Sequence, residues 1–224
     1  MCIFCIFAVQ TNNEMIIDGL KSIANTPIYT GELAALLDGY KSPEMKITAM
    51  EGNNEIIRLK RGMYVVNGNA PISRGLCSNQ IYGPSYVSLQ WALSYYGLIP
   101  ERVRVLTAIT TKRSRNFKNS LGYFTYRQVP KDYFPIGISF AQEDGITFLM
   151  ASPEKALCDM ILADPYLPAK SIIGLERYLL EDLRFDTDAF ADFNISIIEN
   201  CAEQGKKKTI LENLIKIIKR YEHI

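Results

Sequence analysis

Histidine and paired cysteine motifs are scarce in this chain, and their scarcity disfavours several classes of catalytic and metal site. The single histidine, His223, lies at the C-terminal end, so no Ser-His-Asp or Cys-His arrangement can be built around an internal histidine. Cys2 and Cys5 form a CxxC pair, but no second pair supplies the remaining ligands of a zinc site. No Walker loop or GxGxxG motif is present. We therefore expect no enzyme activity, no catalytic residues, no metal and no cofactor.

The chain also lacks an excess of either charge and any long hydrophobic run. Its 25 basic and 24 acidic residues give a net charge of +1, which argues against a protein that coats DNA non-specifically but allows a local basic patch. The apolar residues 1–9 fall short of the roughly 20 needed to span a membrane, and they lack the features of a signal peptide. We predict a cytoplasmic protein with no membrane segment, and its 224 residues are enough for two domains.

The N-terminal third carries a pattern of short helices followed by a basic hairpin. Thr30 and Ser42 precede two of the helical patterns, and their hydroxyls are suited to cap helix starts. Arg61 and Gly62 are suited to the turn of the hairpin. This layout is typical of a winged helix-turn-helix, so we predict a DNA-binding domain over residues 1–66. The predicted elements are helices at 12–25, 31–37 and 43–50, and strands at 56–59 and 63–66.

The hairpin supplies the clearest candidates for contact with DNA. Arg58 and Lys60 alternate with apolar residues, which predicts that both point away from the core, and Arg61 adds a third cation at the tip. Such a wing contacts phosphates beside a groove-bound helix. The alternative is an ordinary surface hairpin with solvated charges. The predicted DNA-binding residues are Lys41, Ser42, Lys46, Thr48, Arg58, Lys60 and Arg61.

The rest of the chain, residues 72–224, is predicted to form a second domain after a turn-rich joint at 67–71. Its pattern mixes strands and helices before becoming helical from Ser152 onward. The predicted fold class is α+β, with an N-terminal winged helix-turn-helix, a mixed α/β domain and a helical C-terminal tail. The expected elements are a helix at 86–96 capped by Ser85, strands at 103–110, 121–129, 136–140 and 146–150, and a last helix at 206–221.

Residues 102–131 contain no Asp or Glu but many cations. Their centre, residues 110–118, is predicted to be a loop between strands, rich in hydroxyls, amides and positive charge. This composition suits phosphate oxygens, and nearby aromatic residues suit base stacking. The alternative is a basic surface that pairs with the acid-rich C-terminal third, which would make the charges unremarkable. The predicted basic patch comprises Lys112, Arg113, Arg115, Lys118 and Arg127.

Two further functions compete with DNA binding. A metal-dependent nuclease built on carboxylates and lysine needs neither histidine nor cysteine, and such an enzyme would hold its nucleic acid on residues 102–131. The last helix, residues 206–221, is amphipathic and would serve a protein-interaction module. The residues available to the nuclease are Glu143, Asp144, Glu154, Lys155 and Asp159.

Four segments, in order, resemble those of bacterial AbiEi-type antitoxins and related predicted transcriptional regulators. The resemblance covers roughly residues 30–164 of the 224 in the chain. The four segments are Arg61-Gly62-Met63-Tyr64, Tyr-Gly-Pro-Ser-Tyr-Val-Ser-Leu at 82–89, Thr-Thr-Lys-Arg-Ser-Arg at 110–115, and Ser-Pro-Glu-Lys-Ala-Leu-Cys-Asp at 152–159.

The resemblance implies the antitoxin of a type IV toxin–antitoxin pair used in abortive infection. In that family a winged-helix domain binds operator DNA and represses its own operon. The C-terminal domain neutralises a nucleotidyltransferase-like toxin without forming a stable complex with it. Carried onto this chain, the resemblance makes Arg58, Lys60 and Arg61 wing contacts, and it makes Lys112, Arg113, Arg115 and Lys118 a basic surface of the effector domain.

Overall fold

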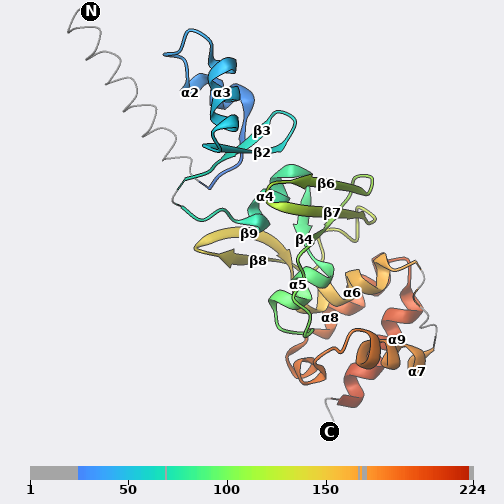
Figure 1. The fold of residues 1–224 in the computed structure, drawn as a ribbon. Coiled ribbons are helices and arrows are strands. Elements are labelled where there is room, and N and C mark those ends of the chain that lie inside the picture. Colours follow the sequence, from blue (N-terminus) through green and yellow to red (C-terminus); the bar gives the residue numbers. More distant parts are fainter. Residues whose placement is uncertain (1–24, 69, 166, 168–170, 222–224) are drawn as a thin grey trace, which may run out of the picture.

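The computed structural model describes residues 25–68, 70–165, 167 and 171–221. It confirms a mixed α+β protein with a three-stranded and a six-stranded sheet. In Figure 1 the N-terminal helices and hairpin, the larger sheet and the C-terminal helices follow one another from top to bottom. The apolar opening 1–9 and the predicted helix over 12–25, apart from Asn25, lie outside the described residues, as do Cys2, Cys5 and His223. Within the described part, no helix is both long and apolar enough to cross a membrane.

The N-terminal unit is a small sheet with two helices against it. The short strand β1 pairs antiparallel with β3, which pairs antiparallel with β2, giving the order β1-β3-β2. Gly62 adopts φ +77° in the β2–β3 turn, a conformation that glycine tolerates better than other residues. The predicted Thr30 cap was wrong, because Thr30 is the first residue of α2 and Tyr29 is its N-cap. Ser42 is the N-cap of α3 as predicted, although its side chain makes no capping bond. The elements are β1 (Ile28–Tyr29), α2 (Thr30–Leu36), α3 (Pro43–Gly52), β2 (Ile56–Lys60) and β3 (Met63–Val66).

The larger sheet has the order β6-β7-β5-β4-β9-β8 and mixes parallel and antiparallel pairs. Tyr126 of β7 contacts Ser78 of α4, whereas Thr107 of β5 bonds to the backbone of Trp91 in α5. Tyr126 pairs with Ala108, so the two share a face of the sheet, and Thr107, the neighbour of Ala108, points to the other face. Helices α4 and α5 therefore cover opposite faces of this sheet. The elements are α4 (Arg74–Ile81), β4 (Ser85–Val87), α5 (Leu89–Tyr95), β5 (Leu106–Thr110), β6 (Arg115–Asn119), β7 (Gly122–Gln128), β8 (Ile138–Glu143) and β9 (Ile146–Ala151).

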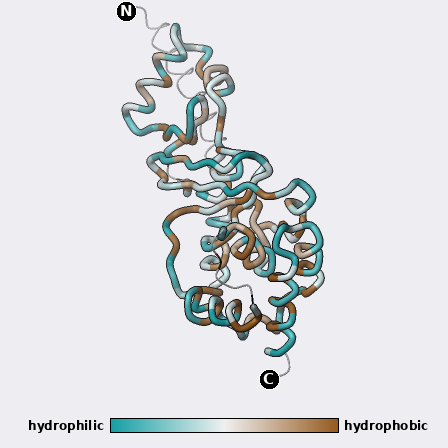
Figure 2. The backbone as a smooth tube through the Cα atoms, turned by 90° about the vertical axis from the view of Figure 1, so that its right-hand side faces the viewer, coloured by the Kyte–Doolittle hydropathy of each residue, from teal (hydrophilic) through white to brown (hydrophobic). Residues whose placement is uncertain are grey.

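Helices pack beside this sheet and form most of the C-terminal part (Figure 1). In Figure 2 the hydrophobic segments concentrate where the central strands meet these helices. The apolar side of α9, including Leu211, Leu214 and Ile218, is buried within the protein. This element therefore docks on its own chain. The elements are α6 (Pro153–Ala163), α7 (Ile172–Arg177), the π-helix η1 (Tyr178–Asp182), the 3₁₀-helix η2 (Thr187–Asp192), α8 (Ile195–Gln204) and α9 (Lys208–Tyr221).

A fully buried ion pair ties α6 to the sheet region. The Lys155 Nζ lies 3.3 Å from Asp159 Oδ1, and neither side chain is exposed. The two Asp159 oxygens accept hydrogen bonds from the Tyr133 hydroxyl, at 2.7 Å, and from the Ser88 hydroxyl, at 2.6 Å. Burial, followed by the Asp159 charge, raises the pKa of Tyr133 well above its usual value, which keeps this hydroxyl a donor.

The hairpin also joins the two sheets. Leu59, Met63 and Val65 are buried in the same apolar cluster as the core of the larger sheet. The Asn119 amide of β6 donates a 3.0 Å hydrogen bond to the Leu59 carbonyl of β2. One edge of the hairpin therefore packs against β6, next to which it lies in Figure 1.

Two predicted elements were wrong, and the short strand β1 and helix α4 were missed. Ser85, Tyr86 and Val87 form strand β4, not the start of a helix. The prediction failed because a central strand that is buried on both faces has a continuous apolar sequence, without the alternation that identifies a strand. Residues 115–119 form the edge strand β6, not part of a loop, since an edge strand tolerates charged side chains. Helix α4 was missed because its mostly polar surface has weak periodicity.

Candidate nucleic-acid interface

The three hairpin cations have different surroundings. Arg58 is exposed on the β2 surface but forms a 2.7 Å ion pair with Glu51 and a 3.1 Å hydrogen bond with the Tyr64 hydroxyl. Arg61, at the tip, is exposed and has no ion-pair partner among the described residues. Arg58 is therefore held in a fixed place, while Arg61 extends into solvent.

Lys60 departs from the prediction that it shares the exposed face with Arg58. A register shift between the two residues breaks the simple alternation of β2. Its ammonium group donates a 2.7 Å hydrogen bond to the Ile81 carbonyl at the end of α4. Burial lowers the pKa of Lys60, and the positive charges of Lys112 and Arg115 lower it further. The hairpin cation and the two cations of the larger sheet therefore lie close enough to repel one another.

A groove of about 410 Å³ runs between the hairpin and β6. Arg58, Lys60 and Arg61 line it from the hairpin side, and Lys118 lines it from β6. Glu51 also lines this groove, paired with Arg58. Two basic segments that are separate in the sequence thus form one surface. We call this region the hairpin–β6 surface. Arg58, Lys60, Arg61 and Lys118 line its groove, and it also includes Lys112 and Arg115, whose charges act on Lys60. Arg115 and Lys118 leave the edge strand β6 on opposite faces.

The cations between residues 102 and 131 do not pair with the acid-rich C-terminal third. Within the described ranges, none of them forms an ion pair, and of the acids in that third Glu181 pairs with Arg177. Arg115 and Lys118 instead lie over aromatic rings, each 5.1 Å from the ring centroid of Phe117 or Tyr123. Their charge remains available to an anionic partner.

The loop before β6 adds two more cations. The Lys112 ammonium lies 5.4 Å from the centroid of the Tyr82 ring and donates to the Gly83 carbonyl. Arg113 is exposed in the turn between β5 and β6. Both cations belong to the predicted basic patch and extend the positive charge along the sheet edge.

The helix α3 presents fewer charges than the sequence indicated. Lys46 is half-buried, with its ammonium 5.3 Å from the centroid of the Tyr40 ring. The Thr48 hydroxyl donates a 2.9 Å hydrogen bond to the Glu44 carbonyl within the helix. Met45, 73% exposed, dominates the outer face, which also carries Glu44, Thr48 and Ala49. Lys41 is exposed before the helix, and Ser42 is half-buried.

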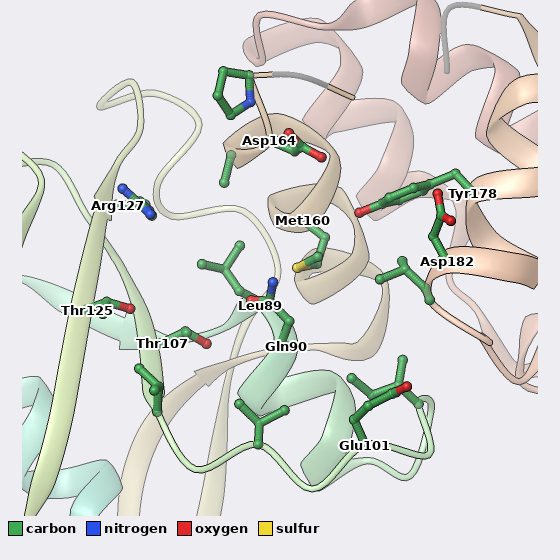
Figure 3. A pocket seen from close by; sticks show the side chains of 16 residues that line it. Leu89, Gln90, Glu101, Thr107, Thr125, Arg127, Met160, Asp164, Tyr178 and Asp182 are labelled. Carbon is green, nitrogen blue, oxygen red and sulfur yellow. The ribbon is translucent and has the colours of Figure 1, made fainter. Parts of the chain in front are cut away.

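Arg127 does not line the hairpin groove, and it points to the sheet face opposite to Tyr126 and Arg115. There it lines a groove of about 750 Å³ that also carries acidic side chains, Asp164 and Asp182, on the opposite wall (Figure 3). Burial, with the charges of these two acids, raises the pKa of Tyr178 to about 12. This groove has mixed charge and is poorly suited to a polyanion.

The residues that a nuclease would need are dispersed. Glu143 and Asp144 lie at one end of the β8–β9 hairpin, whereas α6 begins at the other. Glu154 accepts a hydrogen bond from the Asn194 backbone, and Asp159 is used by the buried ion pair. In the part of the chain that is described, no group of three or more His, Cys, Asp or Glu side chains is placed to hold a metal ion.

Asn119 is a residue of this interface that the sequence did not indicate. Its side chain bonds the hairpin to the sheet across 60 positions of sequence. A polar residue on an edge strand carries no local signal of such a distant contact.

Fold and surface together define a mixed α+β protein with an electropositive junction between its two sheets. No protein-family model matches the chain. No curated protein matches it either. Among solved structures, the fold is similar to that of the RV2827C protein from Mycobacterium tuberculosis, with a TM-score of 0.51 and 15% sequence identity. The match covers 92% of this chain and 81% of the other, and it is a likeness of fold alone.

Proposed function

We propose that this protein is a DNA-binding transcriptional regulator with an N-terminal winged helix-turn-helix, and that it represses its own operon. The proposal rests on the hairpin–β6 surface, where cations from two distant segments converge. Of the described residues that line its groove, Glu51 alone is acidic. Phosphates of a DNA duplex are regularly spaced negative charges that such a surface attracts. The order β1-α2-α3-β2-β3, with β1 paired to β3, supports a winged arrangement.

In this proposal the hairpin and β6 bind phosphates, while α3 enters the major groove. The outer face of α3 offers Met45, Thr48 and Ala49, whose apolar atoms suit the methyl groups of thymine better than the acceptors of guanine. Affinity then comes mainly from the cations, and sequence preference comes from apolar contacts to A·T pairs.

A gel-shift titration tests this function. The full chain is titrated against the DNA upstream of its own gene and against unrelated DNA of equal length and base composition. We expect a shift at lower protein concentration with the upstream DNA, and a loss of that shift in the variant R58A/R61A. A matched control, K216A/K219A, removes two exposed cations from α9 and should bind as the unaltered protein does. Equal, weak binding to both DNAs would contradict the proposal.

The resemblance to AbiEi-type antitoxins extends the proposal to toxin neutralisation in a type IV pair. The C-terminal part would then counteract a nucleotidyltransferase-like toxin without a stable complex. Co-expression with the product of the adjacent gene provides the test, with cell growth as the readout. We expect the full chain to restore growth, and we expect residues 1–66 alone to fail. Growth arrest that the full chain does not relieve would contradict this role.

A further inference from the structure

A second basic pocket lies where β5 and β7 begin, separate from the hairpin groove. It measures about 530 Å³. Three arginines from two segments of the chain contribute to it, together with an aromatic residue and several apolar ones. The lining residues are Arg74, Arg102, Val103, Arg104, Val105, Leu121, Gly122 and Tyr123.

Among the residues that the structure describes, no acidic side chain lines this pocket. Arg102 and Arg104 are exposed, and among the described residues neither has an ion-pair partner. Glu143 accepts a 3.1 Å hydrogen bond from the Arg74 backbone N–H, not from its guanidinium. Like charges gathered in one cavity repel one another, and an anion bound between them relieves that repulsion.

Arg74 is held in place but is not saturated with hydrogen bonds. Its Nη2 donates a 2.9 Å bond to the Arg104 carbonyl, and its guanidinium carbon lies 5.7 Å from the centroid of the Phe124 ring. Its Nε is buried and has no hydrogen-bond partner. A guanidinium fixed on one side with a donor to spare is suited to bind an oxygen anion.

Gly122 keeps the approach to this guanidinium open. Its φ of +119° is one that other residues rarely adopt, and a Cβ at this position would lie 3.2 Å from Arg74 Nη2. Any side chain here would crowd the arginine at the pocket wall. Gly122 therefore allows the backbone to turn into β7 and leaves room for the Arg74 guanidinium.

Tyr123 provides a flat surface at the pocket. It is 52% exposed, and the Lys118 ammonium lies 5.1 Å from its ring centroid. Val103, Val105 and Leu121 supply apolar contact beside it. An aromatic ring next to unpaired arginines is the combination that binds a base together with its phosphates.

We propose that this pocket binds a nucleoside phosphate, with its phosphates on Arg74, Arg102 and Arg104 and its base against Tyr123. Nucleotide binding does not depend on the winged helix, so it can be tested independently of operator binding. Nucleotide would occupy the sheet end, next to the hairpin–β6 surface, whose Lys118 lies over the Tyr123 ring.

Calorimetric titration of the full chain tests the site. The probes are ATP, GTP and UTP, inorganic pyrophosphate, adenosine, and a 5′-phosphorylated oligonucleotide. We expect the nucleotides to bind, pyrophosphate to compete with them, and adenosine not to bind at the same concentrations. The absence of nucleotide binding at millimolar concentration would overturn the proposal. Binding of the oligonucleotide without any mononucleotide would also overturn it, in favour of an extended polyanion track.

Two variants assign the contacts while leaving the half-buried Arg74 intact. R102A/R104A removes only exposed side chains and should weaken ATP binding about tenfold or more, whereas the control K216A/K219A, with the same charge change, should not. Y123L should weaken ATP about fivefold or more through lost base stacking but leave pyrophosphate unaffected. ATP binding that is equal in R102A/R104A and the unaltered protein would overturn the assignment.

Discussion

Removal of the Asp159 carboxylate should be among the most destabilising single changes in this protein. The variant D159A leaves the Lys155 ammonium without its counter-ion in a site where neither side chain is exposed. It also removes the acceptor of the Tyr133 and Ser88 hydroxyls. Breaking a buried pair in this way costs about 3–5 kcal/mol, a large share of the roughly 5–15 kcal/mol that stabilises a typical domain.

The prediction distinguishes the loss of one partner from the loss of both. In K155M/D159L no charge remains unpaired, so we expect the free energy of unfolding to recover at least half of the loss seen in D159A. Urea unfolding followed by circular dichroism measures all three proteins. The exposed acid Asp192 provides a control, since D192A should change the free energy of unfolding by no more than about 0.5 kcal/mol. If D159A lowers the free energy of unfolding by less than about 1 kcal/mol, the buried Lys155–Asp159 pair does not stabilise the fold as predicted.

Three further changes test other parts of the structure. Replacing thymine by uracil in the bound DNA should weaken binding by about 0.8 kcal/mol for each methyl that Met45 or Thr48 covers, measured by fluorescence anisotropy. Burial lowers the pKa of Lys60 below 10.5, its value in the unfolded chain. Between these two pKa values the unfolded chain holds a proton on Lys60 that the folded chain lacks, so the free energy of unfolding rises with pH. In urea unfolding, the unaltered protein should therefore gain stability relative to K60M as the pH rises toward 10.5. N119A removes the bond to the Leu59 carbonyl and should cost about 0.5–1.5 kcal/mol in the same assay, whereas an unchanged midpoint would contradict the docking of hairpin on sheet.

The sequence predicts the fold class and many elements because their signals are local. Turn residues and alternation identify the β2–β3 hairpin, and the long apolar stripe of α9 identifies the last helix. The β4 strand was mistaken for a helix start because Tyr86 and Val87 are buried on both faces, which removes the period-2 signal. Only the folded chain shows that Tyr86 belongs to the sheet.

The site was predicted in parts but not as a whole. Composition alone identifies Arg58 and Lys118 as candidates, yet it does not indicate that the two line one groove. That juxtaposition depends on contacts distant in sequence, such as Asn119 with Leu59. Conversely, Arg127 belongs to the same basic segment but lines a different groove, which also carries Asp164 and Asp182.

The salt dependence of DNA binding tests the hairpin–β6 surface most directly. With six cations facing phosphate, the logarithm of the binding constant should fall with the logarithm of salt concentration with a slope of roughly −5. R58A/R61A and R115A/K118A should each reduce that slope by about 2, although one pair lies on the hairpin and the other on β6. The control K216A/K219A should leave the slope unchanged. A slope that R115A/K118A does not alter would contradict a single surface built from both segments.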